Sequence, residues 1–161
     1  MATRGVGRPR LNRDLQSYIP RIEPDLADAL QVNAQMAGLS LGGYLTHVLS
    51  EAHGYRGRFL QELPAPLPMA LAPELLRERT AALTIDDCTP VIGKGVPTHV
   101  RVDRPVADRI QARVDHLGCA SYSAYVRAIF RVAAGHDQRT RGVQTFLSDE
   151  LMGGVQRRRS A

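Results

Sequence analysis

The chain has no tryptophan, and its aromatic residues are five tyrosines and three phenylalanines among 161 residues. It also lacks an apolar run near the about 20 residues that cross a bilayer, and its N-terminus lacks the apolar core of a secretory signal. Only two cysteines are present, Cys88 and Cys119, with the spacing of neither a disulfide framework nor a zinc site. We therefore expect a cytoplasmic protein with reduced thiols and no membrane association.

Signatures of catalysis are missing as well. Gly93, Lys94 and Gly95 do not have the spacing of a phosphate-binding loop. The five histidines show no ligand spacing with the cysteines, and no motif organises the serines, histidines and aspartates. The sequence predicts no enzyme, no catalytic residue, no cofactor and no metal site.

The net charge is +5, and it is unevenly distributed. Residues 1–13 hold four arginines and no acid, residues 15–53 carry a net −3, residues 97–136 a net +3, and residues 137–161 a net +2. Of the 21 basic residues one is lysine, and the planar guanidinium of arginine matches phosphates and guanine edges. Basic ends favour a polyanionic partner such as nucleic acid, although they also improve solubility.

Two stretches about 80 residues apart read alike. In each, a short extended segment, 17–22 or 97–102, precedes two helical patterns. Pro24 and Pro105 stand where the first helix of each stretch would begin, and Gly38 and Gly118 stand where it would end. The apolar stripes at helical spacing are Leu26, Leu30, Ala34, Ala37 and Val106, Ile110, Val114, Leu117 in the first helices, and Leu41, Tyr44, Leu45, Val48, Leu49, Ala52 and Tyr122, Tyr125, Val126, Ile129, Phe130, Ala133 in the second.

Each unit of about 40 residues is too small to bury a stable core by itself. Each also has one extended segment whose backbone donors and acceptors need a partner. Pairing the two units meets both needs, because the segments form an antiparallel ribbon and the four helices share a core. We predict a mainly α-helical fold with one two-stranded antiparallel β-ribbon.

The strand–helix–glycine–helix order, with residues 21–24 (RIEP) and 101–105 (RVDRP) at the strand-to-helix junctions, resembles the ribbon-helix-helix (Arc/MetJ-type) superfamily of DNA-binding proteins. Two units in one chain resemble its tandem forms, including TraY-type and VirC-type accessory proteins of conjugative DNA transfer. The resemblance implies two ribbon-helix-helix units that pair as an intramolecular pseudo-dimer. The predicted organisation is a basic arm (1–14), unit 1 (15–53), a Pro-rich linker with a short helix at 74–83 (54–96), unit 2 (97–136) and a basic tail (137–161).

Strand side chains alternate between two faces. Val100 and Val102 continue into the apolar stripe of the next helix, so they are expected to face the core. The same register turns Tyr18, Pro20 and Ile22 inward. The expected outward residues, which on a ribbon in the major groove would contact DNA, are Ser17, Ile19, Arg21, Pro97, His99 and Arg101.

Within this ribbon Arg21 and Arg101 take equivalent places, and each can reach a guanine. His99 can donate or accept a hydrogen bond, and Ile19 can contact a thymine methyl group. Both arginines also fit the description of ordinary exposed charge on a strand.

The start of each second helix is the other expected DNA contact. Free backbone N–H groups bind phosphate there, and small residues allow it to approach: Gly42 and Gly43 in unit 1, Ser121 and Ser123 in unit 2. Ser40 and Ser121 are also candidate N-caps, and capping uses the same donors.

In the basic arm, Gly7, Arg8 and Pro9 resemble the core of an AT-hook, which enters the minor groove. Arg8 and Arg10 are therefore candidate DNA contacts, through the minor groove or through phosphates alone. The tail has a short helical pattern at 145–152, which we expect to bind DNA, to bind a partner, or to have no ordered role.

Sequence-specific binding of double-stranded DNA is thus the expected function, first as a transcriptional repressor associated with the nucleoid. A relaxosome or DNA-transfer accessory protein of a plasmid, with a relaxase as partner, is the second reading. An antitoxin-like module that captures a toxin is the third. A second copy on adjacent DNA sites is a further expected partner, and the unlike outward faces of the two strands predict an asymmetric binding site.

Overall fold

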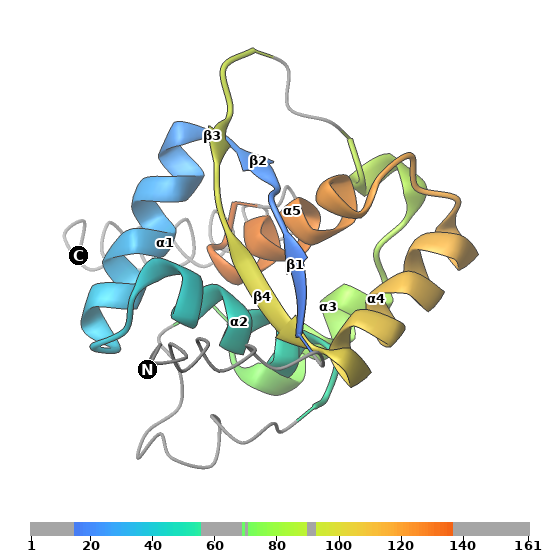
Figure 1. The fold of residues 1–161 in the computed structure, drawn as a ribbon, viewed down its shortest axis with the longest axis horizontal. Coiled ribbons are helices and arrows are strands. Elements are labelled where there is room, and N and C mark those ends of the chain that lie inside the picture. The colour runs from blue at the N-terminus through green and yellow to red at the C-terminus, as the bar shows by residue number, and fades with distance from the viewer. Residues whose placement is uncertain (1–14, 56–68, 70, 90–92, 137–161) are drawn as a thin grey trace, which may run out of the picture.

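The structure, a computed structural model, describes residues 15–55, 69, 71–89 and 93–136. In chain order the elements are β1 (Leu15–Tyr18), β2 (Arg21–Ile22), α1 (Pro24–Met36), α2 (Leu41–Ala52), α3 (Pro73–Ala81), the 3-10 turn η1 (Ile85–Asp87), β3 (Val96–Pro97), β4 (Val100–Asp103), α4 (Arg104–Leu117) and α5 (Tyr122–Ala133). The fold is mainly helical with a small antiparallel ribbon, as the sequence predicts. The ribbon crosses the helices, with α1 on one side of it, α4 on the other, and α2 and α5 passing behind it (Figure 1).

Strands from the two halves of the chain pair with each other. β1 pairs with β4, placing Ser17 opposite Arg101, and β2 pairs with β3, placing Arg21 opposite Pro97. The β1–β4 and β2–β3 ladders have the same register. Pro97 lies 80 positions after Ser17, and Arg21 lies 80 positions before Arg101. The Ser17–Arg101 pair therefore corresponds to the Pro97–Arg21 pair under the 80-residue repeat, so the strand pairing is symmetric about the centre of the ribbon.

The ribbon differs from the prediction in one respect, since each predicted strand is divided into two short strands. The division falls at Pro20. The Thr98 N–H donates to the Pro20 carbonyl at 2.9 Å, but proline has no N–H to return the second bond of the pair. The ladder is therefore interrupted in the middle, while the register continues across the gap.

The predicted helix boundaries are confirmed. Pro24 and Pro105 lie in the first turns of α1 and α4, where a missing N–H costs no helical hydrogen bond. Gly38 and Gly118 follow the two helices with φ of +69°, a left-handed conformation that glycine adopts without steric cost. The predicted linker helix is also present, as α3, and begins at Pro73.

One hydrophobic core joins the ribbon and the helices. Leu26 and Leu30 of α1, Leu76 of α3 and Ile110 of α4 are all fully buried. The largest of the other fully buried side chains are Ile22, Tyr44, Leu45, Leu49, Tyr125, Ile129 and Phe130. The predicted apolar stripes therefore meet in one place, and the linker helix contributes to the same core.

Tyr122 is an exception to the predicted stripe. It stands at the first position of α5 and is 38% exposed. Its ring centroid lies 6.0 Å from that of Tyr18, and its hydroxyl donates to the side-chain oxygen of Gln111. Helical spacing places Tyr122 on the apolar face, but the end of the helix lies at the margin of the core.

A second set of contacts joins α2 to α4 and α5. The His53 Nδ1 donates to the Leu49 carbonyl at 2.7 Å, so its Nε2 is the acceptor for the Tyr125 hydroxyl at 3.1 Å. Burial lowers the pKa of His53, which keeps this ring neutral. Arg109 donates to the His53 carbonyl at 2.5 Å and lies over the Tyr55 ring.

Among helices in the described part of the chain, none combines the length and hydrophobicity that crossing a bilayer requires.

Candidate nucleic-acid interface

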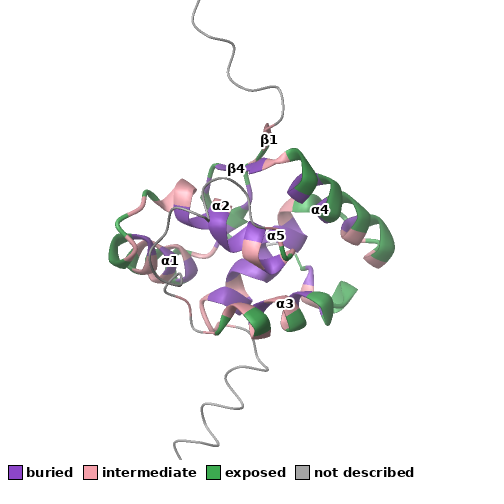
Figure 2. Cartoon of the chain, turned by 90° about the horizontal axis from the view of Figure 1, so that it is seen from below, coloured by how far each residue is buried: buried purple, intermediate pink, exposed green. Residues whose placement is uncertain are grey.

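The outward face of the ribbon is exposed, as predicted. Its members are Ser17, Ile19, Arg21, Pro97, His99 and Arg101. On the opposite face Pro20, Ile22, Val100 and Val102 are buried and Tyr18 is half-buried, so the predicted alternation is confirmed. The ribbon lies at one edge of the molecule and α3 at the opposite edge (Figure 2).

Ile19 is 52% exposed between the two arginine positions. About half of this large apolar residue therefore stays in water, and contact with a thymine methyl is one way to cover it. Arg101 lies four residues beyond Pro97, the partner of Arg21. At about 3.4 Å per residue the two arginines are roughly 14 Å apart along the ribbon, close to four base-pair steps.

Gly95 allows the Arg21 side chain to lie against the chain entering β3. The Arg21 Nη1 donates to the Gly95 carbonyl at 3.4 Å. A Cβ on Gly95 would lie 2.8 Å from the Arg21 Cβ, which is closer than two such atoms can approach. The contact of Gly95 with Arg21 could not be predicted from the sequence, because no local pattern marks it. Gly95 drew attention there only within a Gly-Lys-Gly run that lacks the spacing of a phosphate-binding loop.

A Gly95→Ala variant is therefore expected to lose about 1–3 kcal/mol of unfolding free energy, because the added methyl pushes β2 and β3 apart. Urea unfolding measures the loss. Lys94→Ala is the matched control, since Lys94 is exposed and its removal is expected to change stability by less than about 0.5 kcal/mol. Equal stability of both variants would contradict the close packing at Gly95.

The N-terminus of α2 is fixed against the outer edge of β4. A Cβ on Gly42 would lie 3.1 Å from the His99 carbonyl oxygen, so the small residue there serves this approach. The Thr46 hydroxyl donates to the Arg101 carbonyl at 2.6 Å. Thr46 was not among the predicted site residues, although it holds the backbone of the outward Arg101. The one sequence signal for Thr46 is its position next to the apolar stripe of this helix but not in it, which is typical of a residue at the margin of the core.

Both predicted N-caps are confirmed. The Ser40 Oγ accepts from the Gly43 N–H at 3.1 Å, and the Ser121 Oγ accepts from the Ala124 N–H at 3.2 Å. Ser121 is exposed and Ser123 is half-buried beside it. The Gly43 donor is thus engaged by the cap, which leaves the earlier N–H groups of α2 as the ones suited to an anion.

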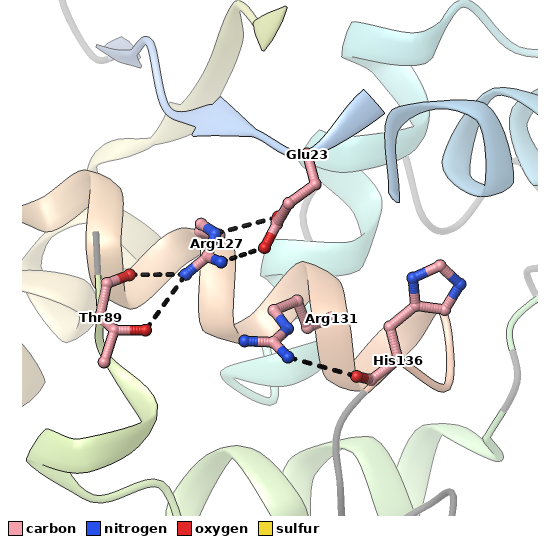
Figure 3. A network of polar contacts seen from close by, with 5 residues as sticks. All are labelled: Glu23, Thr89, Arg127, Arg131 and His136. Carbon is pink, nitrogen blue, oxygen red and sulfur yellow. Dashed lines mark hydrogen bonds and ion pairs between the residues drawn. The ribbon is translucent and has the colours of Figure 1, made fainter. Parts of the chain in front are cut away.

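Unit 2 has a buried arginine where α2 has Thr46. Aligned on their caps, Ser40 and Ser121, the two helices place Arg127 at the position of Thr46. Arg127 is 5% exposed. Its Nε donates to Glu23 Oε2 at 3.0 Å and its Nη2 to Glu23 Oε1, while its Nη1 donates to the Thr89 carbonyl at 2.5 Å (Figure 3).

This contact is an ion pair between the two units. Glu23 is the N-cap residue of α1, two positions after Arg21. Burial alone would raise the pKa of Glu23, but the hydrogen bonds and charge of Arg127, with a smaller contribution from Arg131, hold it below its ordinary value. Sequence reasoning noted the opposite net charges of the units but did not identify this pair, because its partners are 104 residues apart.

Arg8 and Arg10, like the helical pattern of the tail, lie outside the described residues. Within residues 15–55, 71–89 and 93–136 no group of three or more histidine, cysteine or acidic side chains is placed to hold a metal ion.

Comparison with protein-family models, with curated protein sequences and with solved structures found no match.

Proposed function

We propose that this chain binds double-stranded DNA in a sequence-specific manner, with its β-ribbon in the major groove. One observation carries the proposal: Arg21 and Arg101 stand exposed at positions related by the 80-residue shift, on a ribbon whose other face is core. A two-stranded ribbon fits the width of the major groove, and arginine forms two hydrogen bonds with guanine.

In this proposal the two units form an intramolecular pseudo-dimer of the ribbon-helix-helix type. The internal repeat of the ribbon register supports it. The Glu23–Arg127 ion pair also supports it, because a pairing of unit 1 with a second unit 1 would set Glu23 against Thr46 instead of a cation. The tether between the units adds effective concentration to this pairing.

Phosphate contacts come from the beginnings of α2 and α5. The N-terminal turn of a helix presents N–H groups and a positive dipole end to an anion. Contact between α2 and the edge of β4 carries its first turn to the margin of the ribbon. A phosphate bound there would fix the ribbon's position over the bases without reading them.

The biological role that fits first is repression by covering a promoter. An accessory role in DNA transfer uses the same contacts on a different site. A footprint on the protein's own promoter favours the first role, and a footprint beside a nick site favours the second.

Selection from a library of random duplexes tests the proposal with the full chain. We expect enrichment of one sequence with two unlike halves, because Ser17, Ile19 and Arg21 differ from Pro97, His99 and Arg101. Palindromes built from two copies of either half-site should bind more weakly than the selected site with its two unlike halves. Each mismatched base pair at a read position costs about 1–3 kcal/mol.

No enrichment over random duplexes would overturn sequence-specific binding. Equal affinity for both palindromes and for the selected site would contradict the proposal that the two strands recognise different half-site sequences. It would leave the proposal of DNA binding intact.

A further inference from the structure

The outward residues of the ribbon form three rows, each of which joins one residue from either strand. In the two outer rows Ser17 lies opposite Arg101, and Pro97 lies opposite Arg21. The outer rows exchange places under the 80-residue repeat, and each supplies one arginine from a different strand. The two proposed guanine contacts are therefore related by the approximate two-fold axis at the centre of the ribbon, and we expect the guanines to form an inverted repeat.

The middle row breaks this symmetry. The Thr98 N–H donates to the Pro20 carbonyl, so the antiparallel register places Ile19 opposite His99. Both residues are exposed on the outward face. The repeat maps this pair onto itself with its two members exchanged, so an apolar side chain takes the place of an imidazole. The largest chemical difference between the two halves of the outward face therefore lies at its centre.

The two side chains of the middle row lie close together. Thr98 and Pro20 stand at a hydrogen-bonding position of the ladder, so the next pair, Ile19 and His99, is a non-hydrogen-bonded one. In such pairs the Cα atoms are about 4.5 Å apart and the side chains approach most closely. The pair therefore presents one surface, apolar on one strand and hydrogen-bonding on the other.

A T·A base pair matches this surface. In the major groove it presents the thymine methyl group on one strand and the adenine N7 acceptor on the other. A branched apolar side chain packs against the methyl group, and an imidazole N–H donates to N7. Since the ribbon centre is about 7 Å from either arginine position, the matched base pair lies about two steps from each guanine.

We propose that Ile19 and His99 recognise a central T·A base pair, with Ile19 on the thymine methyl and His99 on adenine N7, and so determine the direction in which the chain lies on its site. This inference rests on the proposed DNA binding. The expected site has two guanines in inverted repeat, about four steps apart, with the T·A pair midway between them.

Fluorescence anisotropy with the full chain and the selected duplex tests the inference. Changing the central T·A pair to G·C should weaken binding at least about fivefold. Reversing it to A·T within symmetric flanks should change affinity by less than about twofold, because the chain turns round on the site. Deoxyuridine removes only the thymine methyl group and 7-deazaadenine removes only N7, and each should weaken binding about threefold or more.

Ile19→Ala and His99→Ala are the matched variants, and both side chains are exposed, so the midpoint of urea unfolding should stay unchanged. Ile19→Ala should bind the thymine and deoxyuridine duplexes alike while still discriminating against 7-deazaadenine. His99→Ala should bind the adenine and 7-deazaadenine duplexes alike while still discriminating against deoxyuridine.

A selected site with a G·C centre would overturn the inference, as would variants that discriminate among the four duplexes as the wild type does. A loss of fivefold or more on reversing the central pair would also overturn it, since the flanks would then fix the direction. Each of these results leaves sequence-specific binding intact. A selection that enriches no duplex overturns the proposed DNA binding itself and this inference with it.

Discussion

Replacing Arg21 and Arg101 together with alanine is expected to lower affinity for the selected DNA site by at least about 30-fold. An arginine that binds guanine in the major groove contributes about 1–3 kcal/mol of discrimination, and both side chains are exposed on the outward face of the ribbon. Fluorescence anisotropy at fixed salt measures the loss. The fold should survive, because neither side chain is buried.

The single variants separate base reading from general charge. Each should relax the sequence preference in one half-site, at positions about four base pairs apart, whereas loss of a phosphate contact weakens all duplexes alike. Arg77→Ala is the control of equal charge. Arg77 belongs to α3, the helix at the edge opposite the ribbon (Figure 2), and forms a partly buried ion pair with Glu51 at 3.3 Å. If Arg77→Ala weakens binding as much as the double variant, net charge and not the ribbon determines affinity.

Replacing Glu23 with glutamine is expected to cost about 2–3 kcal/mol of unfolding free energy. The substitution keeps the shape of the side chain but leaves the Arg127 guanidinium buried without a counter-charge. Breaking a buried pair in this way costs about 3–5 kcal/mol. The Glu23 side chain is 35% exposed and Arg127 retains the Thr89 carbonyl, so we place the loss lower. Urea unfolding measures it.

Arg127→Met supplies the complementary arm of a double-mutant cycle. It removes the charge from the core, and Glu23 can turn to water, so the single variant should cost less than Glu23→Gln. The double variant Glu23→Gln/Arg127→Met should then be more stable than Glu23→Gln alone. If it is less stable by the full sum of the two single losses, the side chains do not act as a pair.

The same pair has a defined pH dependence. Because the folded pKa of Glu23 lies below its ordinary 4.5, its stabilising contribution is present above about pH 4.5 and disappears as the pH falls through the folded value. The stability difference between wild type and Glu23→Gln should therefore be constant from pH 6 to 8 and shrink below about pH 4.5. A difference that persists unchanged at pH 3 would show that charge is not its source.

Local sequence determined the elements of this protein. Proline in the first turn, serine at the N-cap and glycine after the last turn act within a few residues, and Pro24, Ser40 and Gly38 do so where expected. The two-residue period of a half-buried strand likewise predicted that Arg21 and Arg101 are exposed. Matching apolar stripes in two stretches predicted that the halves share one core, because neither buries enough surface alone.

Tertiary structure decided which side chains meet. Nothing within the local pattern of Arg127 or Glu23 indicates a partner 104 residues away. The close approach of Gly95 to Arg21 is a second example, since it depends on how the backbones of two strands come together. Periodicity reports which face of an element is buried, whereas the neighbour across that face is set by how all the elements pack together.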